Sequence, residues 1–108
     1  MIIYNVTSNI QKQVAQQWLD WMQNKHIPEI LATAKFSKAV LVRVLVPDEQ
    51  DDVTYAAQFT TSNRETLQKY YTHDAPKFRS ESVTLFGDKV LTFRTELEVI
   101  EEFYVNSN

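Results

Sequence analysis

The sequence predicts a two-layer α+β fold in which two helices cover one face of a four-stranded antiparallel sheet. Three observations support this prediction. β-Branched and aromatic residues gather in four segments, apolar residues at helical spacing fill the two longest intervals between them, and a short polar interval separates the middle two. The resulting order, βαββαβ, is that of the ferredoxin-like sandwich.

One domain accounts for most of the chain. The chain has 108 residues and contains no linker or low-complexity segment that would separate a second unit. A chain of this length buries roughly two thirds of its unfolded surface without disulfides or metal ions. We therefore expect a single ferredoxin-like domain over residues 1–100 and a C-terminal tail over residues 101–108.

Composition excludes several classes of protein. The chain contains no cysteine, which rules out disulfides, thiolate nucleophiles and cysteine-ligated metals. Its formal charge of −3 and its pI near 5.3 disfavour nucleic acid and anionic membranes as partners. The apolar run at the N-terminus is far too short for a signal peptide or a spanning helix. We expect a cytoplasmic protein with neither a nucleic-acid nor a membrane partner.

The first half of the chain predicts a strand followed by a bent helix. Residues 2–7 are rich in strand-forming residues, and Ser8 or Asn9 then offers a helix cap. Apolar residues recur at helical spacing from there. This stripe consists of Ile10, Val14, Trp18, Trp21 and Met22. Pro28 lacks an amide hydrogen, so we expect the helix to break or kink near His26.

The second half predicts a hairpin, a second bent helix and a last strand. Two β-type segments, residues 36–46 and 53–61, flank the acidic turn PDEQDD. Ser62 and Glu65 match a capping box at a helix start. The apolar spacing that follows is interrupted at Pro76 and ends at Gly87, a residue typical of helix C-termini. The last strand is expected over residues 89–100.

Alternation along each strand predicts which face lies under the helices. Successive side chains point to opposite sides of a sheet, so each strand divides into two sets. The more apolar set is expected beneath the helices. It comprises Ile2, Tyr4, Val6, Val40, Val42, Val44, Val46, Tyr55, Ala57, Phe59, Leu91, Phe93, Leu97 and Val99. The other face, which is mixed, still carries more apolar surface than a monomer usually exposes.

A second copy of the chain is the simplest cover for that mixed face. Two such sheets packed face to face form a dimeric α+β barrel, and we expect a homodimer through the sheet face. Polar members of the mixed set would then line the barrel interior: Asn5, Arg43, Gln58, Arg94 and Glu96. The two arginines could bind a small anionic ligand bidentately. Alternatively, these charges form a salt-bridge network between strands that sets the register of the dimer.

Other candidate sites are weaker than this constellation. The Trp18, Trp21 and Met22 stripe is typical of a core seam. His26 and His73 lack the spacing of a metal-binding pair, and we expect no metal and no cofactor. RNA stacking on sheet aromatics, as in domains of the same strand order, is disfavoured because Tyr4 and Phe59 are expected to face the core.

The string of motifs resembles the small bacterial domain of unknown function 4286 family. The matching pieces are MIIYNVT, WLDWM, HIPE, ATAKF, QFTT, APKF, LFGDK and FRTELEV. The resemblance covers nearly all of residues 1–100. It implies a ferredoxin-like domain of the dimeric α+β barrel kind in a family with no established activity, so it transfers no catalytic residue. The layout is more distantly similar to cofactor-free monooxygenases of antibiotic biosynthesis, although here both histidines are expected on helices near bends.

These observations support one leading function and two alternatives. The leading hypothesis is a homodimeric binding or scaffolding module. The first alternative is a cofactor-independent small-molecule enzyme, monooxygenase- or isomerase-like, that uses the barrel interior. There Arg43 and Arg94 would anchor an anionic substrate, with Asn5, Gln58 or His26 assisting. The second alternative is a regulatory contact with another protein through the acidic hairpin tip.

Overall fold

The computed structural model describes residues 1–46 and 52–106, and it confirms the predicted α+β class. Four strands form one antiparallel sheet in the order β2-β3-β1-β4. The strands are β1 (Ile2–Gln11), β2 (Lys38–Arg43), β3 (Asp52–Thr61) and β4 (Val90–Glu98). The helical elements are η1 (Lys12–Val14), α1 (Ala15–Trp21), η2 (Met22–His26), α2 (Ile27–Leu31), α3 (Arg64–His73), α4 (Ala75–Phe86) and η3 (Gly87–Lys89).

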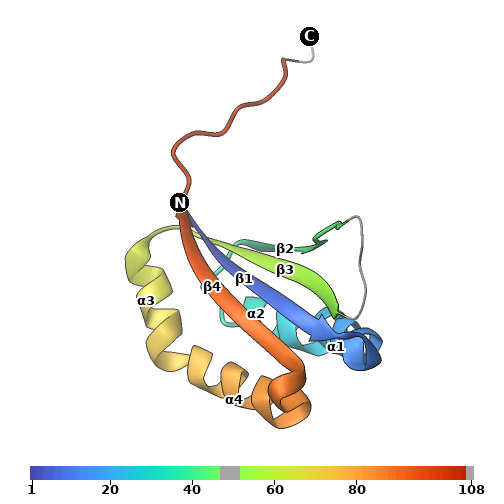
Figure 1. Cartoon of the computed structure of the whole chain (residues 1–108). Coiled ribbons are helices and arrows are strands. Elements are labelled where there is room, and N and C mark those ends of the chain that lie inside the picture. The colour runs from blue at the N-terminus through green and yellow to red at the C-terminus, as the bar shows by residue number, and fades with distance from the viewer. Residues whose placement is uncertain (47–51, 107–108) are drawn as a thin grey trace.

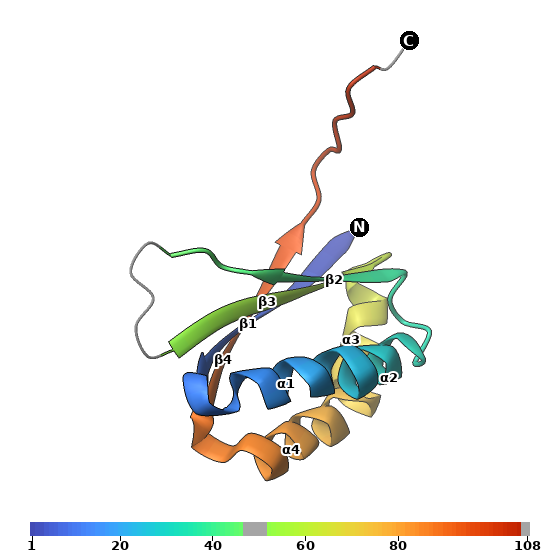
Figure 2. The same cartoon turned by 90° about the vertical axis from the view of Figure 1, so that its right-hand side faces the viewer.

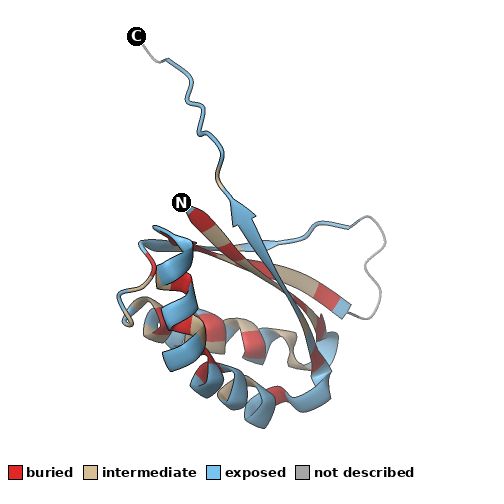
Figure 3. Ribbon diagram, turned by 90° about the vertical axis from the view of Figure 1, so that its left-hand side faces the viewer, coloured by how far each residue is buried: buried red, intermediate tan, exposed pale blue. Residues whose placement is uncertain are grey.

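All helices lie on one side of the sheet. Figure 1 shows the sheet above the helices, and Figure 2 shows α1, α2 and α4 packed together beneath it. The buried residues gather in the layer between the two (Figure 3). No described residue covers the opposite side of the sheet, which we call the open face. The side under the helices is called the helix face below.

β1 is longer than its sequence predicts. Ser8 and Asn9 were expected to cap a helix, but both lie in the strand, where Asn9 pairs with Thr54 and with Leu91. β1 is a central strand, so each added residue gains pairing with two neighbours, and this outweighs a local cap. The first helical turn accordingly begins at Lys12.

The first helix continues through Pro28 instead of breaking. Residues Met22–His26 form a π-helical turn, and α2 follows with Pro28 in its first turn. Proline cannot donate a backbone hydrogen bond to the preceding turn, and the wider π turn accommodates that loss without ending the helix. The bend predicted near His26 is therefore a π turn. The helix ends before Ala34, whose φ of 63° reverses the chain.

The second helix is interrupted where the sequence predicts. α3 ends at His73 and α4 begins at Ala75, with Pro76 in its first turn. The N-terminal cap of α3 is Asn63, one residue after the expected Ser62. Asn63 Oδ1 accepts a hydrogen bond from the amide of Thr66 at 2.8 Å. Gly87 terminates α4 at φ 56° and ψ −131°, a conformation that favours glycine.

The register corrects the predicted faces of both edge strands. Side chains of directly paired antiparallel residues lie on the same side of a sheet. Tyr4 pairs with Phe59 and Glu96, and Phe59 pairs with Ala39, so all four share the helix face. The prediction was right for the central strands and wrong for β2 and β4. Most of their large apolar residues lie on the open face: Val40, Val42, Leu91, Phe93 and Leu97.

The error has a physical cause. We assumed that the more apolar set of every strand lies under the helices, as holds for a sheet whose other face meets water. The edge strand β4 instead turns Thr92, Arg94 and Glu96 toward the helices. Leu91, Phe93 and Leu97 lie on the open face, so that face is more apolar than predicted.

An aromatic core joins the helices to the centre of the sheet. The Tyr4 ring lies 6.3 Å from Phe36, 6.2 Å from Phe59 and 5.8 Å from Tyr70, measured between centroids. Trp18 is buried, with only 2% of its surface exposed, and Met22 is buried beside it. The predicted helical stripe is therefore part of the core, and Tyr4 and Phe59 present no ring for stacking bases.

Candidate functional site between the helices and the sheet

A pocket lies between the helix layer and the helix face of the sheet. Its floor comes from β1, β3 and β4, and its walls come from α1, η2, α2, α3 and α4. The hollow contains about 520 Å³ of non-atom space with its open mouth included, and about 50 Å³ admits the centres of water-sized molecules. The smaller figure is the better guide to what fits without movement, and it is well below the roughly 150 Å³ of an apolar cavity that binds benzene.

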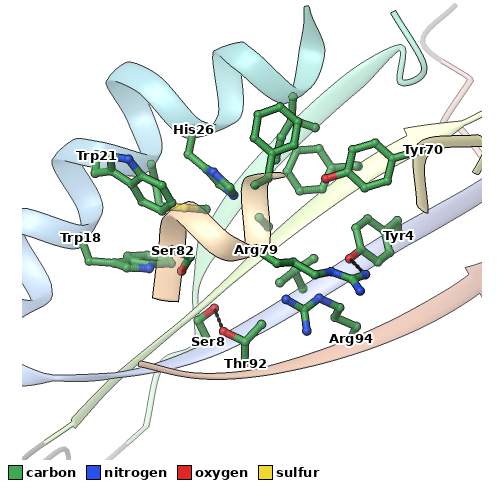
Figure 4. A pocket seen from close by; sticks show the side chains of 16 residues that line it. Tyr4, Ser8, Trp18, Trp21, His26, Tyr70, Arg79, Ser82, Thr92 and Arg94 are labelled. Atoms are coloured by element: carbon green, nitrogen blue, oxygen red, sulfur yellow. Dashed lines mark hydrogen bonds between the residues drawn. The ribbon is translucent and has the colours of Figure 1, made fainter. Parts of the chain in front are cut away.

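Aromatic rings form a large part of the pocket wall (Figure 4). The Trp21 and His26 rings stack with centroids 4.2 Å apart and planes 25° apart. The His26 and Phe78 rings meet edge to face, with centroids 5.7 Å apart and planes at 90°. η2 supplies His26 and Met22 to this wall, so the π turn predicted only as a bend contributes directly to the pocket.

Two buried nitrogen atoms in this wall lack hydrogen-bond partners. They are Trp21 Nε1 and His26 Nδ1, and neither has a partner among residues 1–46 and 52–106. Burial lowers the pKa of His26 to about 4, against the opposing effect of the Glu81 and Glu29 carboxylates. His26 is therefore neutral at pH 7. Buried polar atoms are nearly always satisfied, so these two nitrogens are exceptions among the described residues.

Two arginines lie on the same side of the pocket. Arg79 comes from α4 and Arg94 from β4, and Figure 4 shows both guanidinium groups next to Tyr4. Arg79 donates to the Tyr4 hydroxyl at 3.2 Å, and its guanidinium carbon lies 5.8 Å from the centroid of the Tyr71 ring. Within the described part of the chain, neither guanidinium pairs with a carboxylate.

The acidic residue closest in sequence to Arg94 on the helix face is held elsewhere. Glu96 accepts from Arg64 at 2.6 Å and from the Tyr71 hydroxyl at 2.8 Å, both on α3. The Tyr71 hydrogen bond, with the Arg64 pair, lowers the pKa of Glu96. Burial, followed by the Glu96 hydrogen bond, raises the pKa of Tyr71. Both carboxylate oxygens of Glu96 therefore accept a hydrogen bond from α3.

The five residues predicted as a shared barrel lining do not share a face. Asn5 and Gln58 are paired neighbours on the open face, where Asn5 Nδ2 also donates to Thr7 Oγ1 at 3.1 Å. Arg43, Arg94 and Glu96 lie on the helix face. The shared-face prediction was wrong because it depended on the reversed edge strands. Of the five, only Arg94 lines the pocket.

Several pocket residues were not proposed from the sequence. Arg79 directly follows Phe78, an apolar residue of the second predicted helix, but an arginine beside such a residue is usually solvated. The sequence assigns Trp21 to the core, and it assigns His26 to a helix bend or, in the enzyme alternative, to an assisting role in the barrel interior. The signal that could have united them was their spacing around a single bent helix, and it required knowing which helix face met the sheet.

The described residues were compared with the requirements of a metal site and of a membrane-spanning helix. In that part of the chain, no three His, Asp or Glu side chains are grouped so that they could hold a metal ion. None of the helices observed there is long and apolar enough to cross a membrane. The acidic hairpin tip considered above lies mostly in residues 47–51, outside the described residues.

Comparison with known sequences identifies the family. The profile of the domain of unknown function DUF4286 matches residues 1–100. The chain belongs to the DUF4286 family. No curated protein matches this DUF4286 domain at a significant level.

Comparison with solved structures shows the same fold in dimeric proteins. A dimeric ferredoxin-like protein from an uncultured marine organism matches with a TM-score of 0.67 at 14% identity, covering 97% of this chain and 100% of that one. An EthD family protein from Bacillus halodurans matches with a TM-score of 0.66 at 15% identity, covering 91% of this chain and 100% of that one. SnoaB, a cofactor-independent oxygenase from Streptomyces nogalater, matches with a TM-score of 0.63 at 9% identity, covering 94% of this chain and 95% of that one. The DUF4286 domain thus resembles dimeric α+β barrel proteins, as predicted.

Proposed function

We propose that this DUF4286 domain is a homodimer that binds a small molecule in the pocket of each protomer. The proposal keeps the binding module expected from the sequence but moves its site from the open face to the space under the helices. The observation that carries it is the aromatic pocket wall with two unpartnered buried nitrogens, Trp21 Nε1 and His26 Nδ1. Concave, mostly apolar pockets with a few polar groups are typical small-molecule sites.

The open face supports the homodimer. Its large apolar residues on β2 and β4 are between 37% and 64% exposed in the single chain: Val40, Val42, Leu91, Phe93 and Leu97. Apolar patches of this kind usually mark a protein interface. A dimeric ferredoxin-like protein of the same fold is consistent with a second copy as the partner.

The two faces of the sheet would then have separate roles. Pairing through the open face leaves the pocket accessible, because the pocket opens on the other side of the sheet. Asn5 and Gln58 would lie in the dimer interface, where they can hydrogen-bond across it. We retain them as proposed interface residues, and Arg94 as a proposed ligand-binding residue.

Binding can be measured through the two tryptophans that line the pocket. We expect members of a fragment library to quench or enhance the fluorescence of Trp18 and Trp21, with saturation in a titration. Ser82→Leu places a larger side chain in the pocket and should abolish this response. Ser80→Leu is the matched control, because Ser80 is exposed on the same helix and does not line the pocket. Equal binding by Ser82→Leu, or no saturable response to any fragment, would contradict the proposal.

A cofactor-independent enzyme using the same pocket is the second candidate. It is favoured by the fold shared with SnoaB and by the neutral, unpartnered His26 in the pocket wall, which could accept a proton. The test is to incubate a bound fragment with the protein in air and to examine it by mass spectrometry and NMR. Conversion that His26→Gln abolishes would support an enzyme, whereas an unchanged ligand supports a binding module.

A further inference from the structure

We propose that the pocket binds a small aromatic carboxylate, with the carboxylate between Arg79 and Arg94 and the ring among the aromatic side chains. This inference rests on the proposed function and names the ligand class of the same site. Three features of the described residues carry it: the charge of the pocket lining, the chemistry of the inner wall and the available volume.

The lining carries positive charge and no described negative charge. Arg79 and Arg94 line the pocket, and the described lining residues include no Asp or Glu. This is unusual in a chain whose formal charge is −3. Two guanidinium groups from different elements line the pocket, and Figure 4 shows both directed toward Tyr4. Such like charges repel each other, and an anion between them would remove that repulsion.

Arginine is well suited to this role. The guanidinium group presents parallel N–H donors that match the two oxygens of a carboxylate. Arg79 is oriented by its hydrogen bond to the Tyr4 hydroxyl and by its contact with the Tyr71 ring. The neighbouring acid Glu96 does not compete for this position, because Arg64 and Tyr71 bind it.

The inner wall favours a flat, uncharged group. Its rings belong to Tyr4, Trp18, Trp21, Phe59, Tyr70 and Phe78. Aromatic side chains pack against a planar ring by stacking and by edge contacts. A second charge at this end of a ligand would be poorly solvated, because the described inner wall contains only neutral groups near pH 7, His26 included.

The volume limits the ligand to roughly one ring. About 50 Å³ admits the centres of water-sized molecules, so a ligand of several fused rings would not fit without movement of the helices. A single aromatic ring with one carboxylate satisfies the apolar wall and the charge, and it is accommodated only by the whole hollow of about 520 Å³, open mouth included. Benzoate is the simplest probe of this class.

The test compares three probes: benzoate, its neutral isostere benzamide, and acetate, which lacks the ring. We expect benzoate to bind about tenfold more tightly than benzamide or acetate, measured by calorimetry and by tryptophan fluorescence. Arg79→Gln and Arg94→Gln should each weaken benzoate binding about tenfold and leave benzamide unchanged. Both arginines are exposed, so these variants should fold, and thermal unfolding checks this. Lys69→Gln, which removes the same charge from an exposed position outside the pocket, should change neither probe.

The outcomes separate this inference from the proposed function. Equal affinity for benzoate and benzamide, or unchanged benzoate binding in both arginine variants, would overturn the aromatic carboxylate. Acetate binding as tightly as benzoate would overturn the role of the ring. A third outcome is that benzoate does not bind, whereas other fragments bind and Ser82→Leu abolishes their binding. The proposed ligand class would then be wrong and the proposed binding pocket would be supported. If nothing binds, both proposals fail.

Discussion

His26 shows how the position of one side chain changes its chemistry. It lies at the end of the π turn, stacks on Trp21 and meets the edge of Phe78. Glu81 and Glu29 favour its charged form, and Lys25 opposes it. Both carboxylates also contact Lys25, at 2.8 and 2.9 Å, which reduces their effect on the imidazole. Burial therefore dominates, and the pKa falls.

We predict that the fold loses stability in mild acid because of His26. The pKa is about 4 when folded and near 6.5 when unfolded, so below pH 6.5 the unfolded chain binds the proton more readily. Between pH 7.5 and 5 the free energy of unfolding should fall by about 2 kcal/mol from this residue. Urea denaturation at both pH values measures it. This fall in the free energy of unfolding should be smaller in His26→Gln than in the original protein, and in His73→Gln it should equal that of the original protein. An equal fall in all three proteins would show that His26 is not its source.

Trp18 is predicted to be the costliest tryptophan to truncate. Its indole is 2% exposed and lies 5.4 Å from the Tyr55 ring between centroids. Trp18→Ala should lower the free energy of unfolding by about 3–5 kcal/mol, as core aromatic truncations do. Chemical denaturation monitored by circular dichroism gives the value. A loss below about 1 kcal/mol would mean that Trp18 does not pack in the core.

At this scale the sequence predicted burial better than it predicted the site. Helical spacing identified Trp18 and Met22 as core residues, because that pattern depends on neighbours along one helix. Arg79 and Arg94 line one pocket because of the way α4 lies relative to β4. These two elements are separated along the chain by the turn at Gly87. No local pattern encodes that meeting.

Among the elements, order and type were predictable and several boundaries were not. Strand propensity, the two prolines inside helical patterns and Gly87 gave the βαββαβ order and the interruption between α3 and α4. The N-terminal helix boundary was missed because pairing with β4 as far as Ile10 and with β3 as far as Gln11 extends β1 beyond the polar residues that resemble a cap. Tertiary pairing here outweighed a local signal.

The edge strands show the limit of face prediction from alternation. Alternation separates the two sides of a strand but does not say which side meets the helices. In β1 and β3 the apolar set coincides with the core. In β4 it does not, because Leu91 and Phe93 lie on the open face while Thr92 and Arg94 line the pocket.

A charge on the open face of β4 should separate the protomers. Phe93 is 64% exposed in the single chain, so Phe93→Asp should leave the protomer folded and place an unpaired charge in the proposed interface. We expect size-exclusion chromatography with light scattering to report a monomer. Val83→Asp is the control, because Val83 is 67% exposed on α4, on the other side of the molecule. An unchanged dimer in Phe93→Asp would contradict the placement of the interface.

The C-terminal tail is predicted to be dispensable for the fold of the domain. The amide of Val99 donates to the carbonyl of Met1 at 2.9 Å, and this is the last backbone hydrogen bond between β1 and the β4 end of the chain. The chain then runs away from the sheet and the helices (Figure 1). Phe103, Tyr104 and Val105 are more than four fifths exposed. Truncation after Ile100 should change the melting temperature by less than about 2 °C. A larger drop would show that the tail stabilises the domain.

For the whole molecule, the sheet divides two kinds of surface. On the helix face, the layer of helices buries an aromatic core and leaves a pocket with two arginines at one end. On the open face, the edge strands present valine, leucine and phenylalanine to the outside. The sequence predicted that the open face needs a cover, and the corrected register makes that face more apolar.

The central claim is that a second copy covers the open face. Sedimentation equilibrium of the intact chain at roughly 50 μM measures this most directly, because a dimer is favoured by concentration. The account predicts a mass twice that of the 12.6 kDa chain. A mass of 12.6 kDa across the concentration range would contradict it.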